Sequence, residues 1–205
     1  MSPRAAASAW VASSARPSSS TAPVPRSPTT TSAVSLASAP RAIFSRRRST
    51  TTSSIGDRVF VDTGAFIALA DRSDQYHLAA TQILRALVAR RARFVTTNVV
   101  RGETLTWLTR THGLGHAAAV RFAEWLDARA LRVDENTHRF AGWTLVIVSA
   151  ETEALAHEIF VRHDRSRLSY ADCVSFATMR RTGIQTALAF DQHFAELGFA
   201  LASAE

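Results

Sequence analysis

The sequence has a single cysteine, Cys173, so an internal disulfide is excluded, and this fits a reducing compartment such as the cytoplasm. Its apolar runs all stay shorter than the roughly 18 residues that a membrane-spanning helix needs, which argues against a membrane protein. The GxGxxG and Walker sequences that bind nucleotide phosphates are also missing, which weakens the hypothesis of a nucleotide-binding domain. Hydrophobic residues nevertheless make up 46% of the chain, enough for a proper core.

Acidic residues are missing from the first 56 positions. This segment contains seven of the 24 basic residues and none of the 17 acidic ones, so residues 57–205 carry 17 charges of each sign and the segment carries the whole net charge of +7. It is mostly Ala, Ser, Thr, Pro and Arg, and such a chain cannot bury enough surface to offset its ordering entropy. We expect a disordered tail over 1–56. A leader that targets an organelle, and a translation start nearer Ile55, are two other interpretations.

From residue 57 onward, short apolar segments alternate with segments of helical periodicity. Strands are predicted at Val59–Val61, Phe94–Thr96, Leu145–Val148 and, as the last clear strand, Ala187–Phe190. Helices are predicted over 74–91, 98–110, 114–129, 151–163 and between Ser169 and Gly183, the first with Leu78, Ile83, Leu84, Leu87 and Val88 on its apolar face. The stretch 131–143 is ambiguous, and a short strand followed by a loop is one interpretation. The alternation predicts one α/β domain over 57–205, with a mostly parallel sheet flanked by helices.

Four carboxylates come from four separate parts of this domain. Asp62 ends the first predicted strand within the apolar run RVFVDTGAFIALAD, Asp191 ends the last clear one, Asp172 lies in the first turn of a helix, and Glu103 lies within a helix. Ligands of an open parallel sheet bind outside the carboxyl ends of its strands. Crowded carboxylates raise one another's pKa unless a cation lies among them, and hard oxygen ligands suit Mg²⁺ or Mn²⁺. A site of this kind supports phosphodiester hydrolysis.

Each acid, taken singly, also has a structural explanation. These are Asp62 as a helix N-cap, Asp172 as the third residue of a capping box, Asp191 as a cap for the turn before His193–Leu197, and Glu103 as a partner of Arg101 or a neighbouring arginine. The joint pattern favours a site, because two of the acids lie at the predicted carboxyl ends of strands.

The ordered motifs resemble those of the PIN-domain nucleases, and most closely those of the VapC-type toxins of type II toxin–antitoxin pairs. They are VDTGAFIAL, then Glu103 in a helix, then LSYADCVSFATMRRTGIQTALAFDQHF, and the resemblance runs from about Arg58 to Phe199. It implies a PIN-like three-layer sandwich and a Mg²⁺- or Mn²⁺-dependent endoribonuclease. It also implies that Asp62 is a direct metal ligand, that Glu103 orients a ligand water, and that Asp172 and Asp191 lie at the metal cluster.

The resemblance implies an RNA substrate, a cognate antitoxin that inserts a chain near the acidic pocket, a homodimer, and a cytoplasmic location. Many relatives have Ser or Asn two residues after the first Asp, where this chain has Gly64, and Thr63 or Asn98 are candidates to replace that group. The alternative hypothesis is a non-catalytic PIN-fold module that binds RNA or a protein.

Other reactive side chains have weaker support. His112 and His116 are closely spaced, but Gly113 and Gly115 between them indicate a loop rather than a zinc site. Cys173 is interpreted as a packed residue rather than a nucleophile, since no histidine partner is indicated. The tryptophans Trp107, Trp125 and Trp143 are interpreted as core or dimer surface. The arginines before Asp172, which are Arg162, Arg165 and Arg167, either bind RNA phosphates or are solvated loop charges.

Overall fold

The computed structural model describes residues 58–111, 114–136, 140–163 and 168–204. The predicted tail over 1–56 lies outside these residues, and so do His112, Arg165 and Arg167. None of the helices in the described part of the chain is long and apolar enough to cross a membrane.

The described residues form one six-stranded sheet in the order β3-β4-β2-β1-β5-β6, and every neighbouring pair is parallel. The strands are β1 (Arg58–Val61), β2 (Arg93–Thr97), β3 (Ala130–Asp134), β4 (Trp143–Ile147), β5 (Thr186–Leu188) and β6 (Ala200–Leu201). The central strands β1 and β2 are almost fully buried, as their apolar and β-branched sequences require for a parallel sheet covered on both faces. The predicted mostly parallel α/β fold is confirmed.

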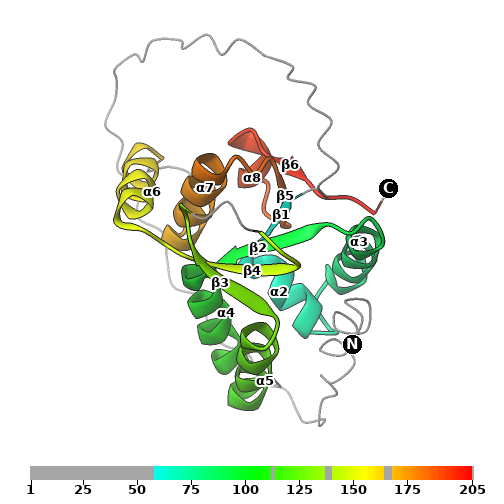
Figure 1. The fold of residues 1–205 in the computed structure, drawn as a ribbon. Coiled ribbons are helices and arrows are strands. Elements are labelled where there is room, and N and C mark those ends of the chain that lie inside the picture. The colour runs from blue at the N-terminus through cyan, green and yellow to red at the C-terminus, as the bar shows by residue number, and fades with distance from the viewer. Residues whose placement is uncertain (1–57, 112–113, 137–139, 164–167, 205) are drawn as a thin grey trace, which may run out of the picture. The chain divides into compact units, whose positions relative to one another are not determined.

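Seven helices accompany this sheet in the described residues. They are α2 (Thr63–Ala70), α3 (His77–Ala89), α4 (Asn98–Arg110), α5 (Gly115–Asp127), α6 (Ala150–Arg162), α7 (Tyr170–Thr182) and α8 (His193–Glu196). Helices α2, α4 and α5 lie below the sheet in Figure 1, and α6, α7 and α8 lie above it. This three-layer arrangement follows from right-handed crossovers: the chain steps from β1 toward β3 with helices on one face, then returns to β5 with helices on the other.

Helix ends are set by short polar residues directly after the strands. Thr97 closes β2 and accepts the Val100 N–H at the start of α4, and Ser149 likewise accepts the Thr152 N–H at the start of α6. Gly183 ends α7 in the left-handed conformation at φ 67°, which costs glycine little. At its other end α7 begins after Ser169, whose side chain accepts the Asp172 N–H, so both predicted ends of α7 are confirmed.

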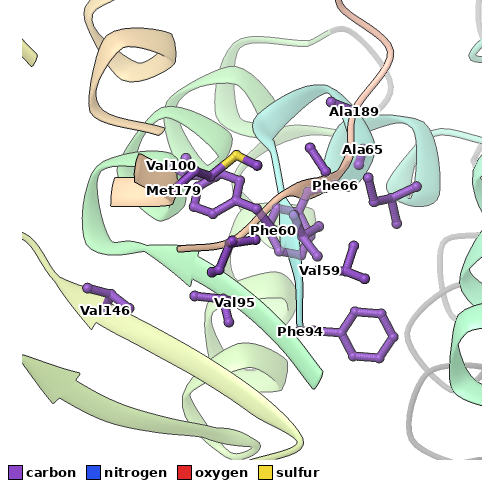
Figure 2. Packing of buried hydrophobic residues seen from close by; sticks show 14 of the residues in the cluster. Val59, Phe60, Ala65, Phe66, Phe94, Val95, Val100, Val146, Met179 and Ala189 are labelled. Atoms are coloured by element: carbon purple, nitrogen blue, oxygen red, sulfur yellow. The ribbon is translucent and has the colours of Figure 1, made fainter. Parts of the chain in front are cut away.

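The core lies on both faces of β1 and β2. Figure 2 shows side chains of the sheet, including Phe60 and Val95, together with Phe66 of α2 and Met179 of α7 in this cluster. Phe66 contacts Phe122 edge-on, with ring centroids 5.0 Å apart. Each fully buried side chain of this size contributes roughly 1.5–3 kcal/mol relative to exposure. The core fixes the ends of the central strands, where the candidate site begins.

Three details of the prediction were wrong. Leu78 was placed on the apolar face of α3, but it is 68% exposed, because at about 100° per residue it points away from the buried stripe of Ala80, Leu84 and Leu87. The strand predicted at Leu145–Val148 covers Trp143–Ile147. The strand predicted at Ala187–Phe190 covers Thr186–Leu188, and a further two-residue strand, β6, follows it, so Asp191 lies three residues beyond the strand rather than at its end.

Candidate active site

Asp62 lies at the carboxyl end of β1 and is only 4% exposed. One of its oxygens, Oδ2, accepts the N–H of Gly64 at 3.2 Å, which makes Asp62 the N-cap of α2. The other oxygen, Oδ1, is buried and has no hydrogen-bond partner among the described residues. Burial, and then the nearby charges of Asp172 and Glu103, raise the pKa of Asp62 from 3.8 to about 7. The N-cap interpretation therefore accounts for one oxygen and leaves the other unexplained.

Glu103 projects from α4 toward the start of α2. Its Oε2 accepts a 2.6 Å hydrogen bond from the Thr63 hydroxyl, a contact between residues 40 positions apart. The predicted pairing with Arg101 is wrong, because Arg101 instead binds Asp127 at 2.8 Å. Among the described residues, Glu103 is thus held beside Asp62 by a neutral donor, the Thr63 hydroxyl, and forms no ion pair with an arginine.

Asp172 lies in the first turn of α7. Its Oδ2 accepts the backbone N–H of Ser169 at 2.8 Å, while its own N–H donates to the Ser169 hydroxyl at 3.1 Å. The predicted capping box is therefore present. Burial raises the pKa of Asp172 in spite of these hydrogen bonds, and the charge of Asp191 adds to the rise. Capping and a role at the site are compatible, since Asp172 also acts electrostatically on Asp62.

Asp191 lies in the turn before α8, and 41% of its side chain is exposed, whereas Asp62 is buried. Its Oδ1 accepts the backbone N–H of His193 at 2.9 Å, and the His193 Nδ1 lies 2.8 Å from the same oxygen. The predicted turn cap is therefore present. His193 opposes the rise in the pKa of Asp172, so it belongs to the same electrostatic group.

The four acids form a chain of electrostatic neighbours that runs from buried Asp62, beside Glu103 and Asp172, to the partly exposed Asp191. In the parts of the chain that the structure describes, no three His, Cys, Asp or Glu side chains converge tightly enough to form a ready-made metal cage. Mg²⁺ does not need one, because it keeps several waters and is commonly held by one or two carboxylates. The buried and unpartnered Oδ1 of Asp62, with further carboxylates beside it, fits a divalent cation.

The position two residues after Asp62 also adjoins the site. A Cβ at Gly64 would lie 3.7 Å from the Asp62 Oδ2, so a serine or asparagine there would be next to the acid. Of the two candidates to replace that group, Asn98 is committed elsewhere, since its Oδ1 accepts the N–H of Val148 at 3.0 Å. Thr63 is the one at the site, through its bond to Glu103.

The other reactive residues have structural roles. Cys173 is fully buried, and burial raises the pKa of its thiol to about 11, which confirms that it is a packed residue. Trp125 and Trp143 belong to the core, where Trp143 stacks on Phe94. Arg162 is exposed and binds Glu158 at 3.2 Å, one turn away on α6.

Sequence reasoning named Thr63 as a candidate but missed its contact with Glu103, and it missed His193. Thr63 is adjacent to Asp62, but its partner Glu103 is distant in sequence, so no local pattern revealed the contact. His193 lies two residues after Asp191, and this Asp-x-His spacing was the available signal.

Comparison with known proteins identifies the family of the chain. A PIN domain family model matches residues 59–200. The 23S rRNA-specific endonuclease VapC20 from two strains of Mycobacterium tuberculosis, CDC 1551 / Oshkosh and H37Rv, is 38% identical over 141 residues, which is 69% of this chain and 95% of VapC20. The crystal structure of M. tuberculosis VapC20, described as a sarcin–ricin loop cleaving toxin, superposes with a TM-score of 0.56 at 36% identity, covering 69% of this chain and 96% of that one. The resemblance inferred from the motifs is confirmed: the chain belongs to the PIN domain family.

Proposed function

We propose that this chain is a toxin-type PIN-domain endoribonuclease that hydrolyses RNA phosphodiester bonds with the help of Mg²⁺ or Mn²⁺. The observation that carries the proposal is the buried Asp62, whose Oδ1 lacks a partner among the described residues and whose pKa is raised toward 7 beside two further acids. A buried carboxylate in this state is costly unless a cation accompanies it. The likeness to VapC20, named as a 23S rRNA-specific endonuclease, supports RNA as the substrate.

The metal ligands in this proposal are Asp62, Asp172 and Asp191, with Glu103 at their side. When bound, the cation would offset negative charge on the phosphate and lower the pKa of a coordinated water. The chain's own residues position the reactants. Asp62 is fixed by its N-cap bond and Asp172 by its capping box, so both carboxylates are oriented before substrate arrives.

Glu103 has the proton-handling role in this proposal. The Thr63 hydroxyl occupies its Oε2, so we assign Oε1 as the atom that orients the attacking water and accepts its proton. Thr63 is accordingly a positioning residue. Because 41% of the Asp191 side chain is exposed, we assign its side of the site to the approach of RNA toward the buried Asp62.

The proposal extends to partners and location. A toxin of this family implies a cognate antitoxin, and we propose a homodimer in the cytoplasm with residues 57–205 as the nuclease domain. The substrate to try first is 23S rRNA with its sarcin–ricin loop, because that is the described target of VapC20.

The test is cleavage by the full-length protein of intact ribosomes and of total RNA, with Mn²⁺, with Mg²⁺ and with EDTA. Asp62→Asn is the informative variant, and Asp127→Asn is its matched control. Asp127 pairs with Arg101 and Arg132, and it is not among the charges that shift the pKa of Asp62 or Asp172. We expect metal-dependent cleavage that Asp62→Asn loses and Asp127→Asn keeps. Cleavage that persists in EDTA, or in the Asp62 variant, would refute the metal-dependent mechanism. A folded protein that binds RNA but cuts none of it would favour the non-catalytic module.

A further inference from the structure

An aromatic pair lies next to Asp191, the partly exposed member of the four acids. The rings of Tyr76 and Phe190 are stacked, with centroids 4.6 Å apart and planes 9° from parallel. Phe190 directly precedes Asp191 and packs against the core, whereas Tyr76 is 41% exposed. The inner ring is thus anchored, and the outer ring presents aromatic surface to solvent near Asp191, whose side chain is 41% exposed.

The loop that carries Tyr76 is firmly held. The Tyr76 N–H donates to Asp74 Oδ1 at 2.7 Å, and the Asp74 N–H donates to the Asp71 carbonyl at 3.0 Å. Asp71 in turn accepts two hydrogen bonds from Ser73, and the His77 ring contacts the Ala68 carbonyl at 2.7 Å. A side chain that is already ordered loses little conformational entropy when it binds a ligand.

The stack is poorly explained by folding alone. The aromatic residues that build the core are fully buried, namely Phe60, Phe66, Phe122, Phe176 and Phe194. If Tyr76 served only to hold the start of α3 against the loop after β5, burying its ring in the same way would stabilise the fold most. Tyr76 instead remains exposed to solvent, and so does the neighbouring Leu78.

We propose that the exposed face of Tyr76 is a stacking platform for an unpaired RNA base next to the scissile phosphate. This inference rests on the proposed ribonuclease function and names its substrate class as RNA with an unstacked base, in a loop or a bulge, beside the cleavage point. Phe190 directly precedes Asp191 and carries Tyr76 on its ring, so RNA that approaches Asp62 from the side of Asp191 would pass this stack. Unpaired bases bind proteins by stacking on aromatic rings, and a third ring would extend this stack. Because every base has a π-face, Tyr76 selects for unpaired geometry rather than for base identity.

The test measures RNA binding rather than cleavage. Full-length protein carrying Asp62→Asn is titrated with hairpin RNAs that have 2-aminopurine at successive loop positions, and both fluorescence quenching and anisotropy are followed. In this background we compare Tyr76→Leu, Tyr76→Phe and Phe160→Leu. Phe160 is the matched control, an aromatic residue that is 46% exposed and contacts Tyr170 instead of Phe190.

We expect quenching at one loop position, and we expect Tyr76→Leu to abolish it and to weaken binding roughly 10- to 100-fold. Tyr76→Phe and Phe160→Leu should match the parent protein. Binding and quenching by Tyr76→Leu that equal those of the parent would overturn the proposal. So would an equal loss of affinity for fully paired RNA, because that indicates a structural role.

An abasic scan of the loop keeps the proposal testable if Tyr76→Leu fails to fold. The scan then needs only the parent protein: one abasic position should weaken its binding, and this should be the position at which 2-aminopurine is quenched. If no position weakens binding by the parent, the platform does not exist. If Tyr76→Leu folds, the same abasic position should leave its binding unchanged. Cleavage by the unmodified protein is measured separately. Base stacking on Tyr76 without RNA cleavage would refute the proposed ribonuclease function but support the stacking platform. RNA cleavage without stacking would support the ribonuclease function and refute the platform.

Discussion

Replacing Asp62 by asparagine should stabilise the metal-free protein at alkaline pH. The folded-state pKa of Asp62 is about 7, against 3.8 for an ordinary aspartate, so the folded protein holds this proton more tightly than the unfolded chain does. An acid whose pKa is raised by folding does not lower the free energy of unfolding below about pH 4. It lowers that free energy progressively as the pH rises from about 4 through 7. The shift of about three units corresponds to about 4 kcal/mol at 1.36 kcal/mol per unit. Asparagine cannot ionise and escapes this loss.

The assay is urea unfolding of parent and Asp62→Asn in EDTA at pH 5 and pH 8. We expect the difference in unfolding free energy to move in favour of the variant by a few kcal/mol between these pH values. Adding Mn²⁺ at about 100 times its dissociation constant should then stabilise the parent by about 2.7 kcal/mol and the variant much less. Two results would refute the view that Asp62 is a destabilised buried carboxylate that binds a cation. One is a difference in unfolding free energy that does not change with pH, and the other is equal stabilisation of both proteins by Mn²⁺.

Three further predictions concern the surroundings of the site. Thr63→Val removes the hydroxyl that holds Glu103, and it should slow RNA cleavage about 10- to 100-fold in single-turnover assays while the melting temperature stays nearly unchanged. Glu135→Ala should lower the free energy of unfolding by about 3 kcal/mol in urea titrations, because the buried carboxylate accepts from Ser149, Thr152 and the partly exposed Arg181. Cys173 should react with a thiol reagent only at the rate of unfolding, since it is buried with a raised pKa, and rapid modification of the native protein would contradict this.

The parts of the fold that local chemistry controls were predictable from the sequence. The strand that ends at Val61 follows from its buried, β-branched residues, and the helix from Ser169 to Gly183 follows from a capping box and a left-handed glycine. Leu78 was misplaced because it was grouped with the apolar residues of this helix by type, although its place in the 3.6-residue period lies away from the buried stripe of Ala80, Leu84 and Leu87. The two-residue strand β6 is too short to leave a pattern, and its pairing with β5 depends on contacts made elsewhere.

In the candidate site, too, residues with a local sequence signal were predictable, and contacts between distant segments were not. Asp62 and Asp172 could be identified because a carboxylate after a buried strand and an acid in a first helical turn are local signals. The contacts between Thr63 and Glu103, between Arg101 and Asp127, and between Tyr76 and Phe190 join distant segments. Such pairs depend on how the layers pack, so one sequence without structure does not specify them.

The most direct test of the central claim is the cleavage rate of ribosomal RNA in Mn²⁺ by the full-length protein and by Asp62→Asn, at a pH where both are folded. If the acidic chain is a metal-dependent ribonuclease site, the parent cleaves, EDTA stops it, and the variant is slower by at least about 100-fold. Equal rates for the two proteins would contradict the claim, because Asp62 would then contribute nothing to the chemistry.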